Sequence, residues 1–341
     1  MTSEAATVAD NDRRLETLSR WAADTLALAA VSLVPASEDA SFRRYFRLAL
    51  PNGDSLIAMD APPEHENLGD FTRIAWALAA LGLHVPHVIA EDATRGFALI
   101  TDLGRETYLM RLAAGDDPEP LYPAAIAAQV RLQEWRKPDL PSYDAALLNA
   151  ETALFEAWLL DRHLGLELVP AERALLAHVR ERLTAHALAQ PRVAVHRDYH
   201  SRNLMVSNPL PGVLDFQDAV VGPVTYDLVS LLKDCYIVWP QERRLAWLRE
   251  YREQALAAGI PAGADENEFI AWFDAMGMQR HLKATGIFAR LFHRDGKPDY
   301  LADIPRTLNY VVEAAGALPE FTDFADFLRG RVLPALEAAA A

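Results

Sequence analysis

The sequence contains a single cysteine, Cys235, so no disulfide can form within the chain. Cys235 lies in an apolar stretch with Leu231, Leu232, Ile237 and Val238. This setting predicts a buried, inert thiol and fits a reducing cytosol.

Long apolar runs are also missing. The longest run near the N-terminus, residues 26–34, is short and interrupted by Ser32, and no basic region precedes it. We therefore expect neither an export signal nor a membrane span, and we expect a cytoplasmic protein.

Positive charge is scarce, because 33 Lys and Arg residues stand against 48 Asp and Glu, which gives a formal net charge of -15. Such a chain repels a nucleic-acid backbone, so nucleic acid is not an expected partner. Any bound polyphosphate needs a metal ion or a few placed basic groups to offset its charge.

The length and the patterning predict two lobes or domains. At 341 residues the chain exceeds the size at which one hydrophobic core stops growing. The first hundred residues mix both periodicities. They predict helices over residues 13–30 and 68–81, and strands over 45–50, 55–59, 87–91 and 96–101.

Beyond residue 102 the pattern becomes mostly helical. Helices are expected over residues 123–135, 145–163, 171–189, 224–238, 242–258 and 268–291. A strand-rich island interrupts them, with a strand over 192–195 and a hairpin of 204–206 with 213–216, joined by a turn. The sequence leaves the oligomeric state undecided.

The chemically richest segment lies in this island and reads HRDYHSRN over residues 196–203, followed by LDF over 214–216. Phosphoryl transfer requires an acidic residue that accepts the proton of the attacking hydroxyl, and oxygen ligands that hold magnesium. Asp198, Asn203 and Asp215 can fill these three roles. HRD alone can occur by chance in a surface loop, but the spacing to Asn203 and Asp215 favours a kinase.

These motifs, together with GPVTYDL at residues 222–228, resemble the aminoglycoside phosphotransferase and choline kinase superfamily. The resemblance implies an α+β, protein-kinase-like two-lobe fold. A small strand-rich N-lobe, residues 1–101, would cover the nucleotide, and a larger, mainly helical C-lobe, residues 102–341, would carry the catalytic loop.

The same resemblance implies the roles of individual residues and the cofactors ATP and Mg²⁺. Asp198 would be the catalytic base, with His196 supporting the catalytic loop. Asn203 and Asp215 would be the magnesium ligands, and Asp227 would be structural.

The nucleotide side departs from the family pattern. The turn expected over the phosphates, residues 39–45, has no glycine, and its candidate contacts are Ser41, Arg43 and Arg44. Alternatively, both arginines merely solvate a turn. Met59 stands where the family places a phosphate-binding lysine.

Residues 99–104, LITDLG, resemble the hinge between the lobes, where exposed backbone groups would hydrogen-bond adenine. Thr101 and Leu103 are the expected hinge contacts. An ordinary strand end followed by a turn is the alternative.

Further pieces, MDAPPEHE at 59–66 and MQRHLKATGIFARL at 278–291, resemble bacterial anomeric N-acetylmuramate/N-acetylglucosamine kinases. The resemblance implies an ATP-dependent sugar kinase that phosphorylates the C1 hydroxyl in peptidoglycan recycling. Rival functions are a phosphotransferase of the same fold for an aminoglycoside, homoserine or a choline-like alcohol, and a degenerate nucleotide-binding protein.

Four residues are candidates for contact with the sugar substrate: His200, Gln217, Arg280 and Lys283. Arg280 would bind the muramate carboxylate, since a guanidinium can do so bidentately. Arg280 and Lys283 share one face of an expected helix, and a solvated helix face is the alternative for both.

Overall fold

The computed structural model describes residues 2–37, 42–136 and 138–340, and the chain divides into two compact units. The first unit consists of Met1–Glu106 and Met205–Gln217, and the second of Thr107–Leu204 and Asp218–Ala341. The mixed α and β composition, with a strand-rich part and a larger helical part, agrees with the expected fold class. The predicted division into an N-lobe of residues 1–101 and a C-lobe of residues 102–341 stays a prediction.

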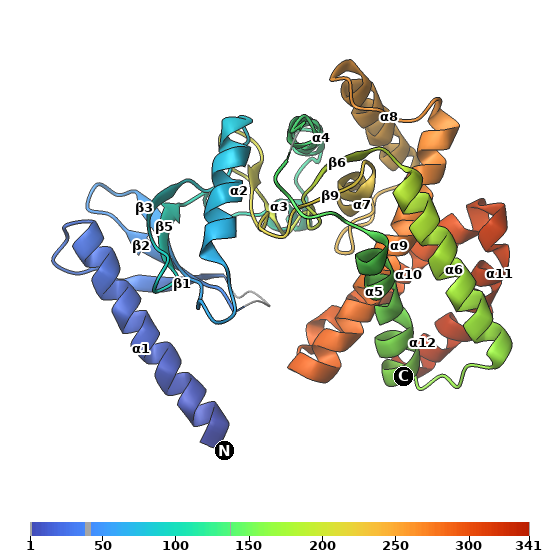
Figure 1. The fold of residues 1–341 in the computed structure, drawn as a ribbon, viewed down its shortest axis with the longest axis horizontal. Helices are drawn as coiled ribbons and strands as arrows, with labels where there is room; N and C mark the ends of the chain where they lie inside the picture. Colours follow the sequence, from blue (N-terminus) through green and yellow to red (C-terminus); the bar gives the residue numbers. More distant parts are fainter. Residues whose placement is uncertain (1, 38–41, 137, 341) are drawn as a thin grey trace. The chain divides into compact units, whose positions relative to one another are not determined.

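A five-stranded antiparallel sheet forms the centre of the first unit (Figure 1), in the order β1-β2-β3-β5-β4. The predicted hairpin is confirmed, since β2 and β3 pair around Gly53, whose φ of 92° favours glycine. The strands are β1 (Leu33–Ser37), β2 (Arg44–Ala49), β3 (Ser55–Asp60), β4 (Val88–Asp92) and β5 (Phe97–Thr101).

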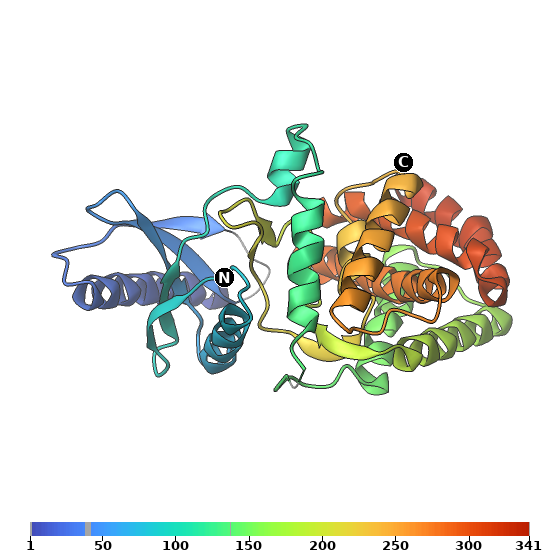
Figure 2. The ribbon, with the colours of Figure 1, turned by 90° about the horizontal axis from the view of Figure 1, so that it is seen from above.

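Two helices accompany this sheet. Helix α1 (Thr2–Thr25) runs along it (Figure 2) and buries Leu18 and Trp21 in a core that includes Phe97. It ends before residue 30 because Ala27 has a φ of 53°, outside the helical region. Helix α2 (Leu68–Ala80) begins at an Asn67 cap and stops before Gly82, close to its prediction.

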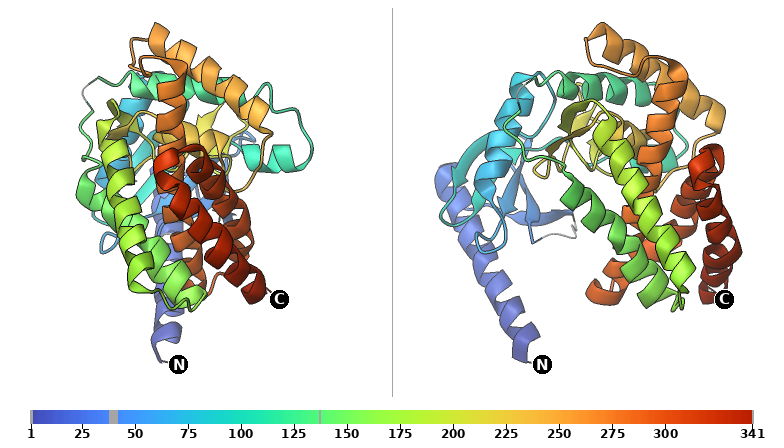
Figure 3. Two further views of the ribbon diagram at one scale, coloured as in Figure 1. Left: turned by 90° about the vertical axis from the view of Figure 1, so that its right-hand side faces the viewer. Right: turned by 45° about the vertical axis from the view of Figure 1, so that its right-hand side comes forward.

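Helices make up most of the second unit, as predicted. The α-helices are α3 (Tyr108–Ala113), α4 (Tyr122–Gln133), α5 (Ala145–Leu154), α6 (Pro170–Ala189), α7 (Tyr226–Leu232), α8 (Gln241–Ala257), α9 (Glu266–Asp295), α10 (Ile304–Ala317), α11 (Thr322–Phe327) and α12 (Leu333–Ala340). Shorter π and 3-10 segments are η1 (Phe155–His163), η2 (Pro298–Asp303), η3 (Pro319–Phe321) and η4 (Leu328–Val332). Figure 3 shows α10, α11 and α12, in red, gathered beside α6.

Helix α9 extends beyond its predicted range of 268–291 at both ends. Asp265 caps its start by accepting a hydrogen bond from the backbone of Glu268, and Gly296, with a φ of 66°, terminates it. At Gly286, helix α9 approaches α5 so closely that a β-carbon would lie 2.4 Å from the carbonyl carbon of Leu154. Glycine is therefore required there by close approach rather than by backbone conformation.

The predicted strand island is present with different boundaries. Strand β6 (Arg192–Val195) pairs with β9 (Val220–Pro223), which the sequence did not predict. The expected hairpin consists of β7 (Leu204–Met205) and β8 (Gly212–Val213). It does not continue to residue 216, because Asp215 has a φ of 62°, incompatible with a strand.

Helix α7 is much shorter than the predicted 224–238. Asp234 accepts hydrogen bonds from the backbone N–H groups of Ser201 and Tyr236, so this carboxylate folds the chain into a turn after Lys233. Within the described part of the chain, no helix is both long enough and apolar enough to cross a membrane.

Candidate active site

The HRD loop, residues 196–203, is fixed to the second unit by a buried carboxylate. Asp227 accepts hydrogen bonds from the backbone N–H of His196 at 2.7 Å and of Arg197 at 3.0 Å. Burial raises the pKa of Asp227 to about 6. Arg197 has a φ of 79°, a strained conformation that these bonds stabilise just before Asp198. Asp227 thus has the structural role expected for it.

Two further side chains hold the backbone around Asp198. His196 is 1% exposed, and its ring Nδ1 accepts a hydrogen bond from the N–H of Asp198 at 3.3 Å. The Asn203 amide Nδ2 donates to the carbonyl oxygen of Asp198 at 3.0 Å. Both backbone groups of Asp198 are therefore held by side chains of the same loop, which restricts the orientation of the candidate base.

The electrostatic surroundings of Asp198 favour its ionised form. Burial on its own would raise the pKa of Asp198, but its charged and polar neighbours outweigh this effect, and the pKa lies below its ordinary value. The groups that lower it are Lys283, His200, Arg280 and Arg197. A carboxylate that is ionised at neutral pH can accept a proton from an attacking hydroxyl. The loop therefore carries a group suited to general base chemistry.

Glu151, on α5, links two of these cations and was missed by the sequence analysis. Its Oε1 lies 2.5 Å from Arg197 Nη2 and 3.1 Å from Lys283 Nζ, and its Oε2 accepts a hydrogen bond from Tyr143. Burial would raise the pKa of Glu151, but the two cations lower it below its usual value. The available signal was an acidic residue at helical spacing from Leu148, on the buried side of its helix.

Arg280 and Lys283 lie on the buried side of α9, so the alternative of a solvated helix face is wrong. Their residues are 5% and 8% exposed. Arg280 Nη1 contacts the sulfur of Cys235 at 3.6 Å, and Lys283 Nζ donates to the hydroxyl of Tyr226 at 3.2 Å. Both charges act on Asp198, while their contact with a sugar stays a prediction.

The other two predicted substrate residues fall in different units. In the second unit, the His200 ring stands edge-on to Tyr236 at 5.4 Å, and burial lowers the pKa of His200 to about 4, so the ring is neutral at pH 7. In the first unit, Gln217 Nε2 donates to Asp215 Oδ1 at 2.5 Å. Neither contact tests a substrate role.

Asp215, the second predicted metal ligand, belongs to the first unit. Its neighbour Phe216 is fully buried and stacks on Phe71 of α2, with ring centroids 5.0 Å apart. Asn203 belongs to the second unit, so a joint magnesium site of Asn203 and Asp215 stays a prediction. Among the described residues, no cluster of three or more His, Cys, Asp or Glu could hold a metal ion.

The predicted phosphate contacts have carboxylate partners. Arg43 forms a 2.6 Å ion pair with Glu66, and Arg44 pairs with Asp60, which is fully buried and also binds Arg14 of α1. Their charges are thus offset within the first unit, and their contact with phosphate stays a prediction. Ser41 lies outside the described residues.

The predicted hinge residues differ in what their backbone can offer a ligand. The Thr101 N–H donates to the carbonyl of His87 at 3.0 Å, and its hydroxyl accepts from the His87 N–H at 2.9 Å. In contrast, the backbone N–H and C=O of Leu103 make no hydrogen bond within the described ranges. Asp102 and Arg47 form an ion pair beside it. Of the two, Leu103 therefore has the open backbone groups, and contact of either residue with adenine stays a prediction.

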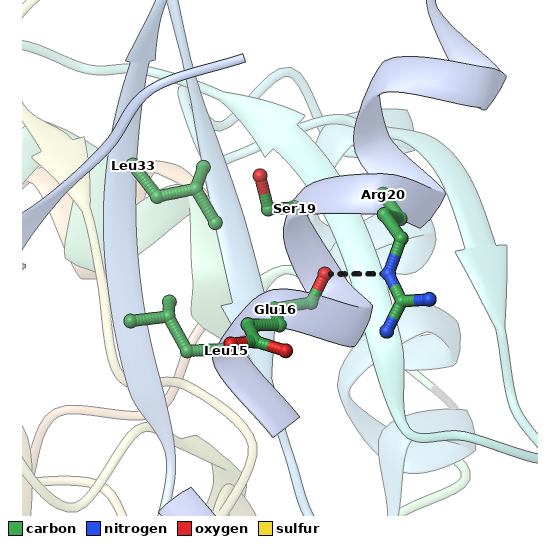
Figure 4. Close-up of a pocket in the computed structure, with 5 residues that line it drawn as sticks. All are labelled: Leu15, Glu16, Ser19, Arg20 and Leu33. Atoms are coloured by element: carbon green, nitrogen blue, oxygen red, sulfur yellow. Dashed lines mark hydrogen bonds between the residues drawn. The ribbon is translucent and has the colours of Figure 1, made fainter. Parts of the chain in front are cut away.

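The first unit also has an open groove of about 470 Å³ between α1 and β1 (Figure 4). Arg20 on its rim donates to the backbone oxygen of Glu16. None of the predicted site residues lines this groove, so it has no part in the candidate site. The lining residues are Leu15, Glu16, Ser19, Arg20 and Leu33.

A small unit built on a five-stranded antiparallel sheet, and a larger helical unit bearing an HRD loop, define a protein-kinase-like fold. A Plasmodium vivax ethanolamine kinase has this fold at 12% identity and a TM-score of 0.59, with 86% of this chain and 83% of that chain covered. An aminoglycoside phosphotransferase bound to ADP has it at 15% and 0.55, with 83% and 94% covered. At such identities the likeness concerns the fold alone.

The sequence comparison is more specific. The profile of the phosphotransferase enzyme family matches residues 32–266, and the chain belongs to this family. An N-acetylmuramate/N-acetylglucosamine kinase of Pseudomonas putida is 48% identical over 332 residues, which cover 94% of this chain and 97% of the relative. Proteins of the same name from Pseudomonas aeruginosa and Neisseria meningitidis are 49% and 42% identical, with 87% and 86% of this chain and 87% and 89% of the relatives covered.

Proposed function

We propose that this chain is an ATP-dependent kinase that phosphorylates the anomeric C1 hydroxyl of N-acetylmuramate and N-acetylglucosamine in peptidoglycan recycling. The observation that carries the proposal is the 42–49% identity, over most of both chains, to three bacterial proteins of that name. The charge environment of Asp198 supports the chemistry. We further propose a cytoplasmic location and no nucleic-acid partner, in keeping with the net charge of -15.

In the proposed reaction Asp198 is the catalytic base. The cations around it favour the carboxylate, which can orient the C1 hydroxyl and accept its proton as the oxygen attacks the γ-phosphorus of ATP. His196 is a positioning residue, because its ring holds the N–H of Asp198. Glu151 contributes indirectly, through Arg197 and Lys283.

Asn203 and Asp215 are the proposed magnesium ligands. An amide oxygen and a carboxylate are the hard oxygen donors that Mg²⁺ prefers, and Mg²⁺ is often held by one or two carboxylates plus substrate phosphates rather than by a full protein cage. When bound, the ion would offset the developing charge on the phosphate oxygens. Each candidate ligand already has an oriented side chain, through Asp198 and Gln217 respectively.

We propose that the first unit is the nucleotide-covering lobe. Leu103 would bind adenine through its open backbone groups, with Thr101 beside it. Ser41, Arg43 and Arg44 remain the proposed phosphate contacts. To bind phosphate, Arg43 would have to leave Glu66, and Arg44 would have to leave Asp60.

The test is to incubate the chain with ATP, Mg²⁺ and a panel of N-acetylmuramate, N-acetylglucosamine, kanamycin, homoserine and choline. Products are identified by mass and by lability in mild acid, since an anomeric phosphate hydrolyses readily. Asp198→Asn should lower kcat by at least about 100-fold, in line with loss of a general base. Asp144→Asn, which alters a helix cap on α5 instead, is the control.

Turnover of only kanamycin, homoserine or choline would refute the sugar substrate and favour a rival of the same fold. No turnover of any compound would favour a degenerate nucleotide-binding protein. Full activity of Asp198→Asn would refute the proposed mechanism but not the proposed sugar substrate.

A further inference from the structure

Arg202, the residue before Asn203 in the HRD loop, is exposed and held in place by two aromatic rings. Its guanidinium carbon lies 3.8 Å from the ring centroid of Tyr236 and 5.3 Å from that of Tyr300. Within the described residues, it has no ion pair and its guanidinium donates no hydrogen bond. Arg202 therefore presents a charged, planar group of donors with a restricted orientation.

Arg202 is close in the sequence to Asp198, the proposed base. The N–H of His200 donates to the carbonyl of Asp198 at 3.1 Å, and the N–H of Asn203 donates to that of His200 at 2.9 Å, so the loop is tightly turned. The His200 ring packs on Tyr236, the same ring that Arg202 covers. The ring of Tyr236 therefore contacts two side chains, those of His200 and Arg202, of the loop that also carries Asp198.

The acidic groups near Arg202 are already engaged. Asp303 forms a 2.9 Å ion pair with Arg306. Burial raises the pKa of Asp303, and the charges of Arg306 and Arg202 oppose this effect. Asp234 accepts two backbone hydrogen bonds. The N–H donors of Arg202 are therefore available to an anionic group of a substrate, because no carboxylate of the described residues binds them.

The two proposed substrates differ in one such group, because N-acetylmuramate carries a lactyl ether carboxylate that N-acetylglucosamine lacks. We infer that Arg202 binds this carboxylate and sets the preference between the acidic and the neutral sugar. The inference rests on the proposed function and assigns to Arg202 the role predicted above for Arg280. Arg280 is 5% exposed and contacts Cys235, so it is poorly placed for a bulky carboxylate.

Because stacking on Tyr236 and Tyr300 restricts the guanidinium before a ligand arrives, less rotamer freedom is lost on binding. A planar fork of N–H donors also matches the two oxygens of a carboxylate. Lysine, a point charge on a flexible stem, should therefore replace Arg202 only in part.

The experiment measures kcat/KM for N-acetylmuramate and N-acetylglucosamine in the wild type, Arg202→Ala and Arg202→Lys. The ratio of the two values should fall by about 10- to 100-fold in Arg202→Ala, as for loss of a charge-assisted hydrogen bond, and by less in Arg202→Lys. The matched control is Arg243→Ala, which removes an arginine stacked on Trp239 and Trp247 of the same unit. It should leave the ratio unchanged.

A change in the substrate gives a second readout that does not depend on how well a variant folds. The methyl ester of N-acetylmuramate should be a poorer substrate than the acid for the wild type. For Arg202→Ala the ester and the acid should be nearly equal, because the partner of the charge is gone.

An unchanged ratio in Arg202→Ala, or equal losses for both sugars, would overturn the inference. So would an ester effect of the same size in wild type and variant. The wild-type measurement distinguishes the two possible failures. If the wild type phosphorylates neither sugar, both the proposed function and this inference are refuted. If it phosphorylates the sugars but Arg202→Ala leaves the ratio unchanged, only this inference is refuted.

Discussion

At the scale of single residues, the candidate site depends on the balance between one carboxylate and the cations around it. Burial raises the pKa of Asp198, and Lys283 has the largest effect among the groups that lower it, ahead of His200, Arg280 and Arg197. These groups come from α9 and from the HRD loop itself. Charges on α9, distant in the sequence, therefore act together with groups of the loop itself to set the protonation state of the proposed base.

Replacement of Lys283 by methionine should move the acidic limb of the pH profile of kcat/KM toward higher pH. The Lys283 cation stabilises ionised Asp198, so its removal raises the pKa of Asp198, and the base becomes protonated at a higher pH than in the wild type. The measurement is kcat/KM for the sugar between pH 4 and 9. Lys297→Met, beyond the end of α9, is the control. An acidic limb that stays in place would contradict this reading.

Sequence motifs were sufficient to propose the candidate residues of the HRD loop, because their spacings are short and fixed, and the catalytic roles of these residues stay predictions. They were insufficient for Glu151, whose partners Arg197 and Lys283 are distant in sequence and meet it only through packing of α5 and α9. Similarly, Arg43 has an acidic partner, Glu66, that no local pattern indicates. Residue type and spacing predict the chemistry that is possible, whereas ion pairing depends on tertiary contacts.

At the scale of elements, the second unit depends on the crossing of α9 and α5 at Gly286. The side of α9 that faces the interior carries apolar residues together with Arg280 and Lys283, so the helix joins the core to the candidate site. Because the two helix backbones approach closely, the position of these cations depends on the absence of a side chain at residue 286.

Gly286→Ala should lower the free energy of unfolding by about 1–3 kcal/mol, because the added β-carbon would overlap the backbone of Leu154. Gly277→Ala on the same helix is the matched control. Its β-carbon would find its nearest neighbour at an ordinary 3.5 Å, and alanine favours a helix interior by about 0.5–1 kcal/mol over glycine. Chemical denaturation followed by far-UV circular dichroism measures both, and equal stability of the two variants would argue against the crossing.

Periodicity predicted the long helices and the hairpin of the first unit well, since their apolar stripes and turn residues are local signals. It failed where side chains interrupt the backbone pattern. Asp234 ends α7 early through two hydrogen bonds, and Asp215 ends β8 through its left-handed backbone. Strand β9 was missed because its partner, β6, lies far away in the sequence and short strands carry little signal.

At the scale of the whole molecule, the chain is acidic and yet is proposed to bind a polyphosphate. The net charge is -15, the position of the usual lysine holds buried Met59, and Arg43 and Arg44 are paired with carboxylates. If the chain binds ATP as proposed, we expect the negative charge of ATP to be offset mainly by the metal ion that accompanies it.

Removal of Mg²⁺ with EDTA should therefore weaken ATP binding by at least about tenfold, whereas binding of uncharged adenosine should be unaffected. Equilibrium titration of each ligand with and without chelator provides the measurement, and adenosine serves as the internal control. Equal ATP affinity in both conditions would show that the protein's own cations suffice.

The single cysteine has a practical consequence. Cys235 is 3% exposed, contacts the guanidinium of Arg280, and has a pKa raised by burial, so it is protected from thiol reagents while the core around α7 and α9 is intact. Because the chain has no other thiol, the rate of its chemical labelling would report the opening of this one region without any prior mutagenesis. The natural sequence thus carries a built-in reporter beside its candidate active site, available for following ligand binding through the kinetics of local unfolding.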